Sequence, residues 1–205
     1  MKIGICGGTF DPFHRGHLDP ILAVFDRVGW DRVIYIPAHV QPFKQDRDTA
    51  SGYDRFAMIS LSILEEEQLF VSPMELERGN ISYTVDTLET VRTFYPNATL
   101  DWIVGDDNLD QLHEWKSIDR IFKLANFVVL TRGGKSVPPA MQIRVTTPEQ
   151  RRSHGAIILA ENPTVPISST EIRRRLHDGE SIEDLVPPPV SRYIHHYGLY
   201  RKGQS

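Results

Sequence analysis

Cysteine is nearly absent from this chain of 205 residues, which contains only Cys6. Neither an intramolecular disulfide nor a thiolate metal cage can therefore form. Long hydrophobic runs are also missing, since no stretch approaches the roughly 18 apolar residues of a membrane span. Excess positive charge is missing too: 23 Lys and Arg against 27 Asp and Glu leave a net charge of −4, which argues against a surface built to coat a nucleic acid polymer or an anionic membrane. We expect a cytoplasmic protein with neither as partner.

The composition that is present belongs to a folded domain. Hydrophobic residues make up 40% and charged residues 24% of the chain, which argues against a disordered protein. A chain of this length can bury a sizeable core, so we expect a single domain over residues 1–205. Self-association into a homo-oligomer stays open at this stage.

Short apolar runs alternate with helical patterns along the chain. The runs rich in Val and Ile predict strands at 2–6, 32–36, 69–71, 100–104, 127–130 and 157–160. Apolar stripes at helical spacing predict helices through Leu18, Ile21, Leu22 and Phe25, through Phe56, Ile59 and Ile63, through Val85, Leu88, Val91 and Tyr95, and through Val190, Tyr193, Ile194 and Tyr197 in a short C-terminal helical region at about 182–200. Residues 37–52 and 132–139 read as loops. The alternation predicts an α/β fold with a doubly wound, Rossmann-like parallel sheet.

The segment after the first predicted strand is the first candidate site, because ligands bind at the carboxyl ends of parallel strands. Residues 7–17 read Gly-Gly-Thr-Phe-Asp-Pro-Phe-His-Arg-Gly-His. His14 and His17 lie three residues apart at a predicted helix start, where imidazoles suit phosphate oxygens. The alternatives are a plain Gly-Gly turn and solvated histidines. A metal site at these histidines is disfavoured, because no third ligand lies nearby in the sequence.

A second candidate follows the last predicted strand, at residues 167–173, Ile-Ser-Ser-Thr-Glu-Ile-Arg. Ser168 and Glu171 fit a capping box, which explains a helix start without any ligand. A capping box does not explain the run of arginines at 173–175, because the helix dipole disfavours cations in the first turns. A bound polyanion would resolve the conflict, with Arg173 converging on it. For Arg174 and Arg175, charge on a solvated face remains the alternative.

Together these two strings resemble the HxGH nucleotidyltransferases, and the chain is similar to the bacterial nicotinate-nucleotide adenylyltransferase branch of that superfamily. Residues 82–87, Ser-Tyr-Thr-Val-Asp-Thr, and residues 105–108, Gly-Asp-Asp-Asn, followed by Trp115, match further blocks of the branch. The resemblance runs from Lys2 to about Tyr197. It implies a Rossmann-like nucleotidyltransferase fold and transfer of the AMP moiety of ATP to nicotinate mononucleotide, with Mg²⁺ bound mainly through the ATP phosphates.

The resemblance also implies roles for individual residues. Catalytic contacts with the ATP phosphates and the leaving pyrophosphate would come from His14, His17 and Arg173. The ATP-binding residues would be Gly8, Thr9, Phe10, Ile167, Ser168 and Ser169. Nicotinate mononucleotide would be bound by Lys44, Thr84, Gly105, Asp107 and Trp115, with Thr84 offering backbone donors to the nicotinate carboxylate, Trp115 stacking on the pyridine ring and Asp107 bonding a ribose or neighbouring backbone.

The chain departs from the family pattern at three places. Residues 41–44 read Gln-Pro-Phe-Lys where Pro-Pro-His and a basic residue are common, and residues 132–134 read Arg-Gly-Gly in place of Arg-Pro-Gly. Lys116 follows Trp115 where relatives often carry an aromatic residue, so stacking on the pyridine would be one-sided. Thr84 could simply begin a helix, and Trp115 could belong to the core. The alternative functions are adenylylation of nicotinamide mononucleotide or phosphopantetheine, and a non-catalytic nucleotide-binding sensor.

Overall fold

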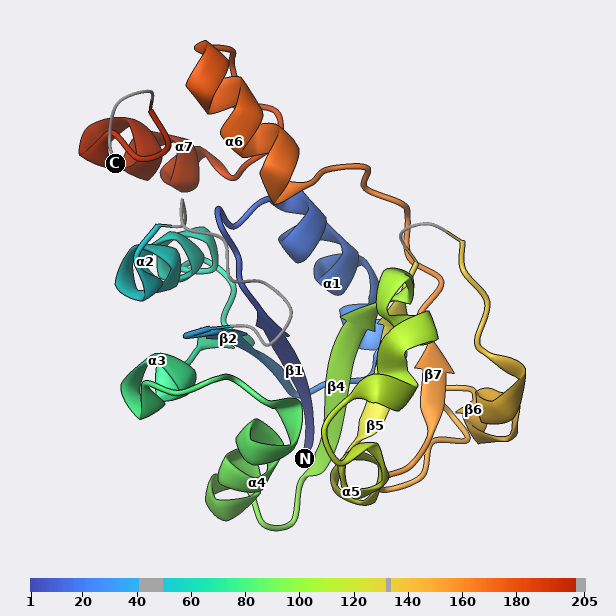
Figure 1. Ribbon diagram of the computed structural model, residues 1–205. Helices are drawn as coiled ribbons and strands as arrows, with labels where there is room; N and C mark the ends of the chain where they lie inside the picture. Colours follow the sequence, from blue (N-terminus) through green and yellow to red (C-terminus); the bar gives the residue numbers. More distant parts are fainter. Residues whose placement is uncertain (41–49, 132–133, 202–205) are drawn as a thin grey trace.

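The computed structural model describes residues 1–40, 50–131 and 134–201, in which a seven-stranded sheet has the order β3-β2-β1-β4-β5-β7-β6 (Figure 1). All neighbouring strands are parallel. The strands are β1 (Lys2–Gly8), β2 (Arg32–Pro37), β3 (Leu69–Val71), β4 (Thr99–Gly105), β5 (Asn126–Leu130), β6 (Val145–Thr146) and β7 (Ile157–Leu159). The predicted α/β fold with a doubly wound parallel sheet is confirmed.

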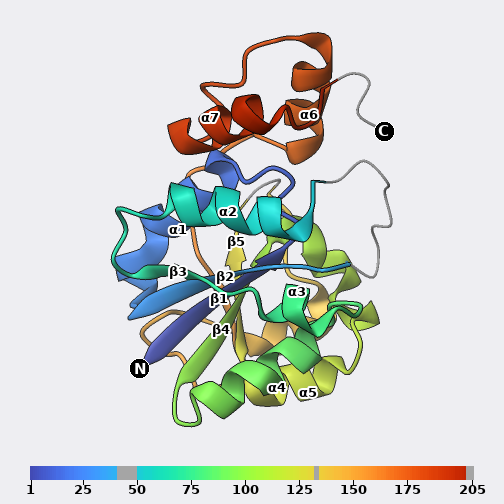
Figure 2. The ribbon, with the colours of Figure 1, turned by 90° about the vertical axis from the view of Figure 1, so that its left-hand side faces the viewer.

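Helices cover both faces of the sheet (Figures 1 and 2). One face carries α1 (Arg15–Val28) and α2 (Gly52–Ser62), and the other carries α4 (Thr84–Phe94) and α5 (Ile118–Leu124). Two helices, α6 (Ser169–Asp178) and α7 (Pro188–Tyr197), lie beyond the carboxyl ends of the strands (Figure 2). The remaining helical elements are α3 (Met74–Arg78) and the 3₁₀ helices η1 (Asp106–Glu114) and η2 (Pro139–Arg144). None of the helices within the described ranges is long and apolar enough to cross a membrane.

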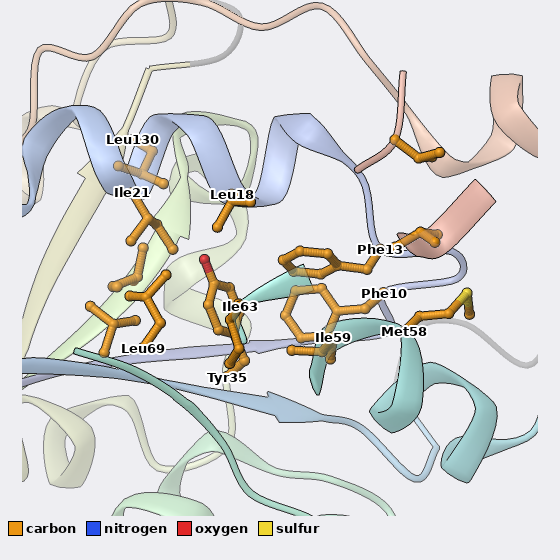
Figure 3. Close-up of a cluster of buried hydrophobic side chains, with 14 of the residues drawn as sticks. Phe10, Phe13, Leu18, Ile21, Tyr35, Met58, Ile59, Ile63, Leu69 and Leu130 are labelled. Carbon is orange, nitrogen blue, oxygen red and sulfur yellow. The ribbon is translucent and has the colours of Figure 1, made fainter. Parts of the chain in front are cut away.

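Two hydrophobic clusters form, one on each face of the sheet, because side chains alternate along every strand. In β2, Val33 and Tyr35 join the cluster under α1 and α2, whereas Ile34 and Ile36 join the cluster under α4 and α5. Figure 3 shows the first cluster near the carboxyl end of β1, where the rings of Phe10 and Phe13 pack close to Tyr35 and Met58 belongs to the same cluster.

The strand order places a topological switch point at β1. From β1 the chain runs outward to β2 and β3, and it then returns to pair β4 with the other edge of β1. A crevice at such a point lies outside the carboxyl ends of the two strands where the order reverses. The segments that follow Gly8 and Gly105 therefore begin side by side.

Some details differ from the sequence prediction. β6 has only two residues, too few for a hydrophobic pattern to reveal it. Leu22 and Tyr197, both assigned to apolar stripes, are 38% and 56% exposed. Each lies at the margin of its stripe, because a helix turns by about 100° per residue and only part of the surface faces the core. Part of the predicted 37–52 loop, residues 41–49, lies outside the described residues.

Candidate active site

The turn after β1 is built around a close approach of backbone to an aromatic ring. A Cβ on Gly8 would lie 2.9 Å from the ring of Phe10, so only glycine fits there. Phe10 has a positive φ of 54° and buries its side chain against Phe13 and Tyr35 (Figure 3). Positive φ costs a non-glycine residue about 1–2 kcal/mol, and burial of this ring offsets the cost. The side chain of Phe10 therefore anchors the turn, which leaves its backbone at the crevice.

His14 and His17 lie together at the start of α1. Their rings stack with centroids 3.6 Å apart, and His14 is 3% exposed. The backbone N–H of His14 donates to Nδ1 of His17 at 3.3 Å. A backbone N–H can only donate, so Nδ1 accepts and the proton of a neutral His17 ring resides on Nε2, the tautomer that can donate to a phosphate oxygen.

The segment between β1 and α1, residues 9–14, is called the first loop below. It contacts the start of α6 beside the two histidines, although the two segments are more than 150 residues apart in sequence. A Cβ on Gly16 would lie 3.0 Å from the His14 ring and 3.4 Å from the carbonyl oxygen of Ile167. Ser169 Oγ donates to the Pro12 carbonyl at 3.2 Å. Glycine between the two histidines thus lets the 167–169 segment approach the first loop.

The Arg173 side chain points toward the first loop and binds Asp11 there. Its Nη1 donates to the Asp11 carbonyl at 2.6 Å and lies 3.7 Å from Asp11 Oδ2. The other carboxylate oxygen of buried Asp11 accepts hydrogen bonds from the Ala50 N–H and from the Tyr200 hydroxyl. Burial and the neighbouring Asp11 carboxylate raise the pKa of Tyr200, so its hydroxyl keeps the proton that it donates. Asp11, itself held by Ala50 and Tyr200, therefore orients the Arg173 side chain.

The other two arginines of the run have a separate explanation. Ser168 caps α6 as predicted, with its Oγ accepting from the Glu171 N–H at 3.2 Å. A capping box also requires the Glu171 side chain to accept from the Ser168 N–H, and this part of the prediction is wrong. The Glu171 carboxylate instead pairs with Arg174 and Arg175 further along the helix. Those pairs lower the pKa of Glu171 to about 2. Arg174 and Arg175 thus belong to a surface network, as the alternative interpretation held.

The middle blocks of the sequence also converge on the carboxyl end of the sheet. Thr84 is the first residue of α4, and the preceding Ser82 is hydrogen-bonded to the segment after β2, through Oγ from the His39 N–H at 3.1 Å and through its own N–H to the Val40 carbonyl at 2.9 Å. The backbone N–H groups of a helix start suit an anionic group. The structure therefore places Thr84 beside the same edge as the first loop.

Trp115 follows η1 and is half-buried, with its ring 5.9 Å edge-on from the ring of Phe127. Lys116 fixes the segment against α4: its Nζ lies 4.2 Å from the Tyr83 ring centre and 3.2 Å from Asp86 Oδ2. The Trp115 block and the block that begins α4 are consequently neighbours, as the prediction of one pyridine-binding subsite requires.

The two adjacent aspartates that follow β4 differ in burial and in their hydrogen-bond partners. Asp107, the predicted binding residue, is exposed and accepts from the Asn108 amide at 3.1 Å. The buried partner Asp106 bonds neighbouring backbone instead, accepting from the N–H of Gly134 at 2.7 Å and of Lys135 at 3.2 Å. Gly105 is the buried last residue of β4, so Asp106 and Asp107 both follow the carboxyl end of that strand, beside the crevice. The sequence contains both carboxylates side by side, and nothing in it shows which one turns inward.

Two further buried groups escaped the sequence interpretation. Arg55 in α2 donates to the carbonyls of Thr9 and Ala38. Glu75 in α3 accepts from the Thr87 hydroxyl behind the α4 start, and burial raises the pKa of Glu75. Neither belongs to a motif. Arg55 could be noticed as a charged residue on the face of α2 that carries Met58 and Ile59, whereas the five-residue α3 offers no such pattern around Glu75.

Lys44, predicted to bind nicotinate mononucleotide, lies outside the described residues. In the part of the chain that the structure describes, no group of three or more His, Cys, Asp or Glu side chains is arranged to hold a metal ion. The site is thus made of imidazoles, arginine, hydroxyls and backbone N–H groups at a switch point, which is the donor set for a polyanionic nucleotide.

Residues 5–175 match the cytidylyltransferase-like family, and the chain belongs to that family. Its similarity within the family is to nicotinate-nucleotide adenylyltransferases. A probable nicotinate-nucleotide adenylyltransferase of Neisseria meningitidis serogroup B is 37% identical over 98% of this chain and 99% of its own length. The corresponding Yersinia pestis protein is 38% identical, with 95% and 93% covered.

Solved structures share the fold. The nicotinic acid mononucleotide adenylyltransferase of Plasmodium falciparum complexed with NaAD superposes with a TM-score of 0.73 at 21% identity, over 97% of both chains. The same enzyme complexed with APC superposes with a TM-score of 0.74 at 20% identity, over 97% of this chain and 96% of that chain. The sequence relatives and the solved structures therefore both match nearly the full length of this chain.

Proposed function

We propose that this chain is a nicotinate-nucleotide adenylyltransferase, which transfers the AMP moiety of ATP to nicotinate mononucleotide and releases pyrophosphate. The product is nicotinate adenine dinucleotide (deamido-NAD), an intermediate of NAD biosynthesis. The observation that carries the proposal is the meeting of the His14–His17 pair with the start of α6 at the switch point. Relatives named for this activity, at 37–38% identity over nearly the full chain, support the choice of acceptor.

The reaction is a direct in-line displacement. A 5′-phosphate oxygen of nicotinate mononucleotide forms a bond to the α-phosphorus of ATP, and the bond from that phosphorus to the α–β bridging oxygen breaks. The electron pair leaves with pyrophosphate. A phosphate monoester with a second pKa of about 6 is largely a dianion at neutral pH, so the step needs neither a general base nor a covalent enzyme intermediate.

Catalysis then consists of alignment and charge stabilisation. His14 and His17 would contact the ATP phosphates, and Arg173 with the hydroxyls of Ser168 and Ser169 would hold the departing pyrophosphate. Gly8, Thr9, Phe10 and Ile167 would line the ATP cleft with backbone groups.

The second substrate would occupy the opposite side of the crevice. Backbone N–H groups at Thr84 would receive the nicotinate carboxylate, and the exposed face of Trp115 would stack on the pyridine. Lys44, Gly105 and Asp107 complete this proposed subsite. Because Lys116 is held against Tyr83 and Asp86, stacking would come from Trp115 alone.

Mg²⁺ is expected to enter with ATP. The chemistry of the site fits an ion held by phosphate oxygens and water, because the groups that surround the crevice are mainly hydrogen-bond donors and cations, which bind phosphate oxygens rather than the ion. Bound in this way, Mg²⁺ would neutralise part of the triphosphate charge.

The test is pyrophosphate release from ATP and Mg²⁺ with nicotinate mononucleotide, nicotinamide mononucleotide or phosphopantetheine as acceptor. We expect turnover to favour the acid, because an anionic carboxylate gains from the α4 N-terminus and an amide does not. Preference for the amide or for phosphopantetheine would overturn the acceptor assignment. No turnover with any acceptor, in folded protein that binds ATP, would favour the sensor.

A further inference from the structure

Arg55 lies in α2, outside every motif, and is 4% exposed. Its guanidinium donates to three main-chain carbonyls: Thr9 at 2.6 Å, Ala38 at 2.8 Å and Ala50 at 3.2 Å. Thr9 follows β1, Ala38 follows β2 and Ala50 precedes α2. One side chain therefore fastens together the segments that leave the carboxyl ends of two neighbouring strands.

Burial of this cation is costly for the fold. Desolvation lowers the pKa of Arg55, and among the described residues its hydrogen bonds go to neutral carbonyls rather than to a carboxylate. Apolar side chains of similar volume often stabilise a core as well as a buried charge does. Elsewhere on the same helix, Met58 and Ile59 pack in that apolar manner (Figure 3). The position of Arg55 thus calls for a reason other than packing.

The reason lies in the Thr9–Phe10 peptide. In a planar trans peptide, the carbonyl and the following N–H point in opposite directions. Because the Thr9 carbonyl is directed at Arg55, the Phe10 N–H is directed away from α2. Among the described residues this N–H has no hydrogen-bond acceptor, and the buried Phe10 ring prevents the turn from rotating.

We propose that Arg55 is a positioning residue: by binding the carbonyls of Thr9, Ala38 and Ala50, it presents the Phe10 N–H to a phosphate group of the nucleotide in the crevice. The inference rests on the proposed function for the identity of that nucleotide, ATP. Arg55 itself touches no substrate and acts through the peptide that it orients.

The test compares Arg55→Lys with a matched control, Arg92→Lys. Lysine keeps the charge but cannot fork to three carbonyls. Arg92 likewise binds carbonyls, those of Ala98 at 2.6 Å and Leu124 at 2.8 Å, but at the amino ends of β4 and β5. Both substitutions should lower the unfolding temperature. Only Arg55→Lys should lower kcat/KM for ATP, by tenfold or more, and weaken the binding of α,β-methylene-ATP.

Kinetics of folded Arg55→Lys within twofold of wild type would overturn the proposal, and so would an equal loss in Arg92→Lys. Should Arg55→Lys not fold, the wild-type protein decides by NMR: α,β-methylene-ATP should shift the Phe10 amide resonance and slow its hydrogen exchange, and an unchanged Phe10 amide would contradict the inference. These binding readouts involve no acceptor. A protein that binds the analogue through Phe10 but does not adenylylate nicotinate mononucleotide would refute the proposed function alone.

Discussion

The tautomer of His17 is set by its neighbour's backbone, and this small detail ties the motif to phosphate chemistry. The His14 N–H occupies Nδ1, and the stacked His14 ring, seated on Gly16, restricts rotation. A side chain of similar size without a ring N–H, placed at position 17, could not replace the Nε2–H donor of His17.

His17→Ala should therefore leave the protein folded and lower kcat by about 10²-fold or more, since a donor that acts on transition-state charge typically contributes that much. Pyrophosphate release measured beside a circular dichroism spectrum checks this. Turnover close to wild type in a folded variant would remove the histidine pair from the mechanism.

Glu75 makes stability depend on pH in a predictable direction. Burial raises its pKa above the ordinary 4.5, against the opposing hydrogen bonds of Thr87 and Ser82. Between about pH 4.5 and the raised pKa, the folded state binds more protons than the unfolded state, so the free energy of unfolding falls as pH rises.

Glu75→Gln should remove this fall and flatten the profile of urea unfolding against pH across that window. Exposed Glu77 on the same helix supplies the control, and Glu77→Gln should leave the slope unchanged. A slope that persists in Glu75→Gln would show that another group titrates.

At the scale of elements, α6 combines a start that faces the site with a flank that faces solvent. Glu171 pairs with Arg174 and Arg175, and its pKa of about 2 means that the pairs stabilise the helix above pH 4.5. That contribution is lost as pH falls toward 2.

Glu171→Gln should lower the unfolding temperature at pH 7, with the difference from wild type narrowing as the pH is lowered from 4.5. Thermal unfolding followed across this range measures the effect, with exposed Glu183→Gln as the control. A difference independent of pH would assign the loss to packing rather than to charge.

Elements with strong periodicity were predictable, and tertiary contacts were not. Strands such as 127–130 are continuous buried runs, and the α4 stripe of Val85, Leu88 and Val91 is buried as its spacing predicts. The two-residue β6 gains its order from pairing with β7, which no local pattern records.

The same division holds for the candidate site. Motif positions such as His14 and Ser168 could be read from the sequence because their spacing fixes a helix start. Arg55 and Asp106 could not, because their partners Thr9 and Gly134 are distant in sequence and are brought to them only by the fold.

Across the whole molecule, the two ends of the sheet carry different groups of polar residues. The carboxyl end carries the site, and the amino end carries a buried charge network. Asp101 on β4, fully buried, accepts from Trp30 Nε1 at 2.8 Å and from Asn126 Nδ2 at 3.0 Å, and it pairs with Arg151 at 2.9 Å. Burial raises the pKa of Asp101, which Arg151 opposes.

Arg151→Met should cost about 3–5 kcal/mol of unfolding free energy, because it leaves a buried carboxylate without its cation. Its kcat, measured well below the unfolding temperature, should stay near wild type since the pair is remote from the crevice. Urea unfolding and steady-state kinetics on one preparation test both statements. A large loss of kcat with little loss of stability would contradict the separation of the two ends.

The central claim, that the crevice between β1 and β4 joins an adenylyl group to nicotinate mononucleotide, is tested most directly by a crystal structure with deamido-NAD bound. We expect the diphosphate bridge to lie against Phe10 and the His14–His17 pair, with the nicotinate carboxylate at the α4 start and the pyridine on Trp115. A dinucleotide bound anywhere else, or bound here with its pyridine away from Thr84 and Trp115, would contradict it.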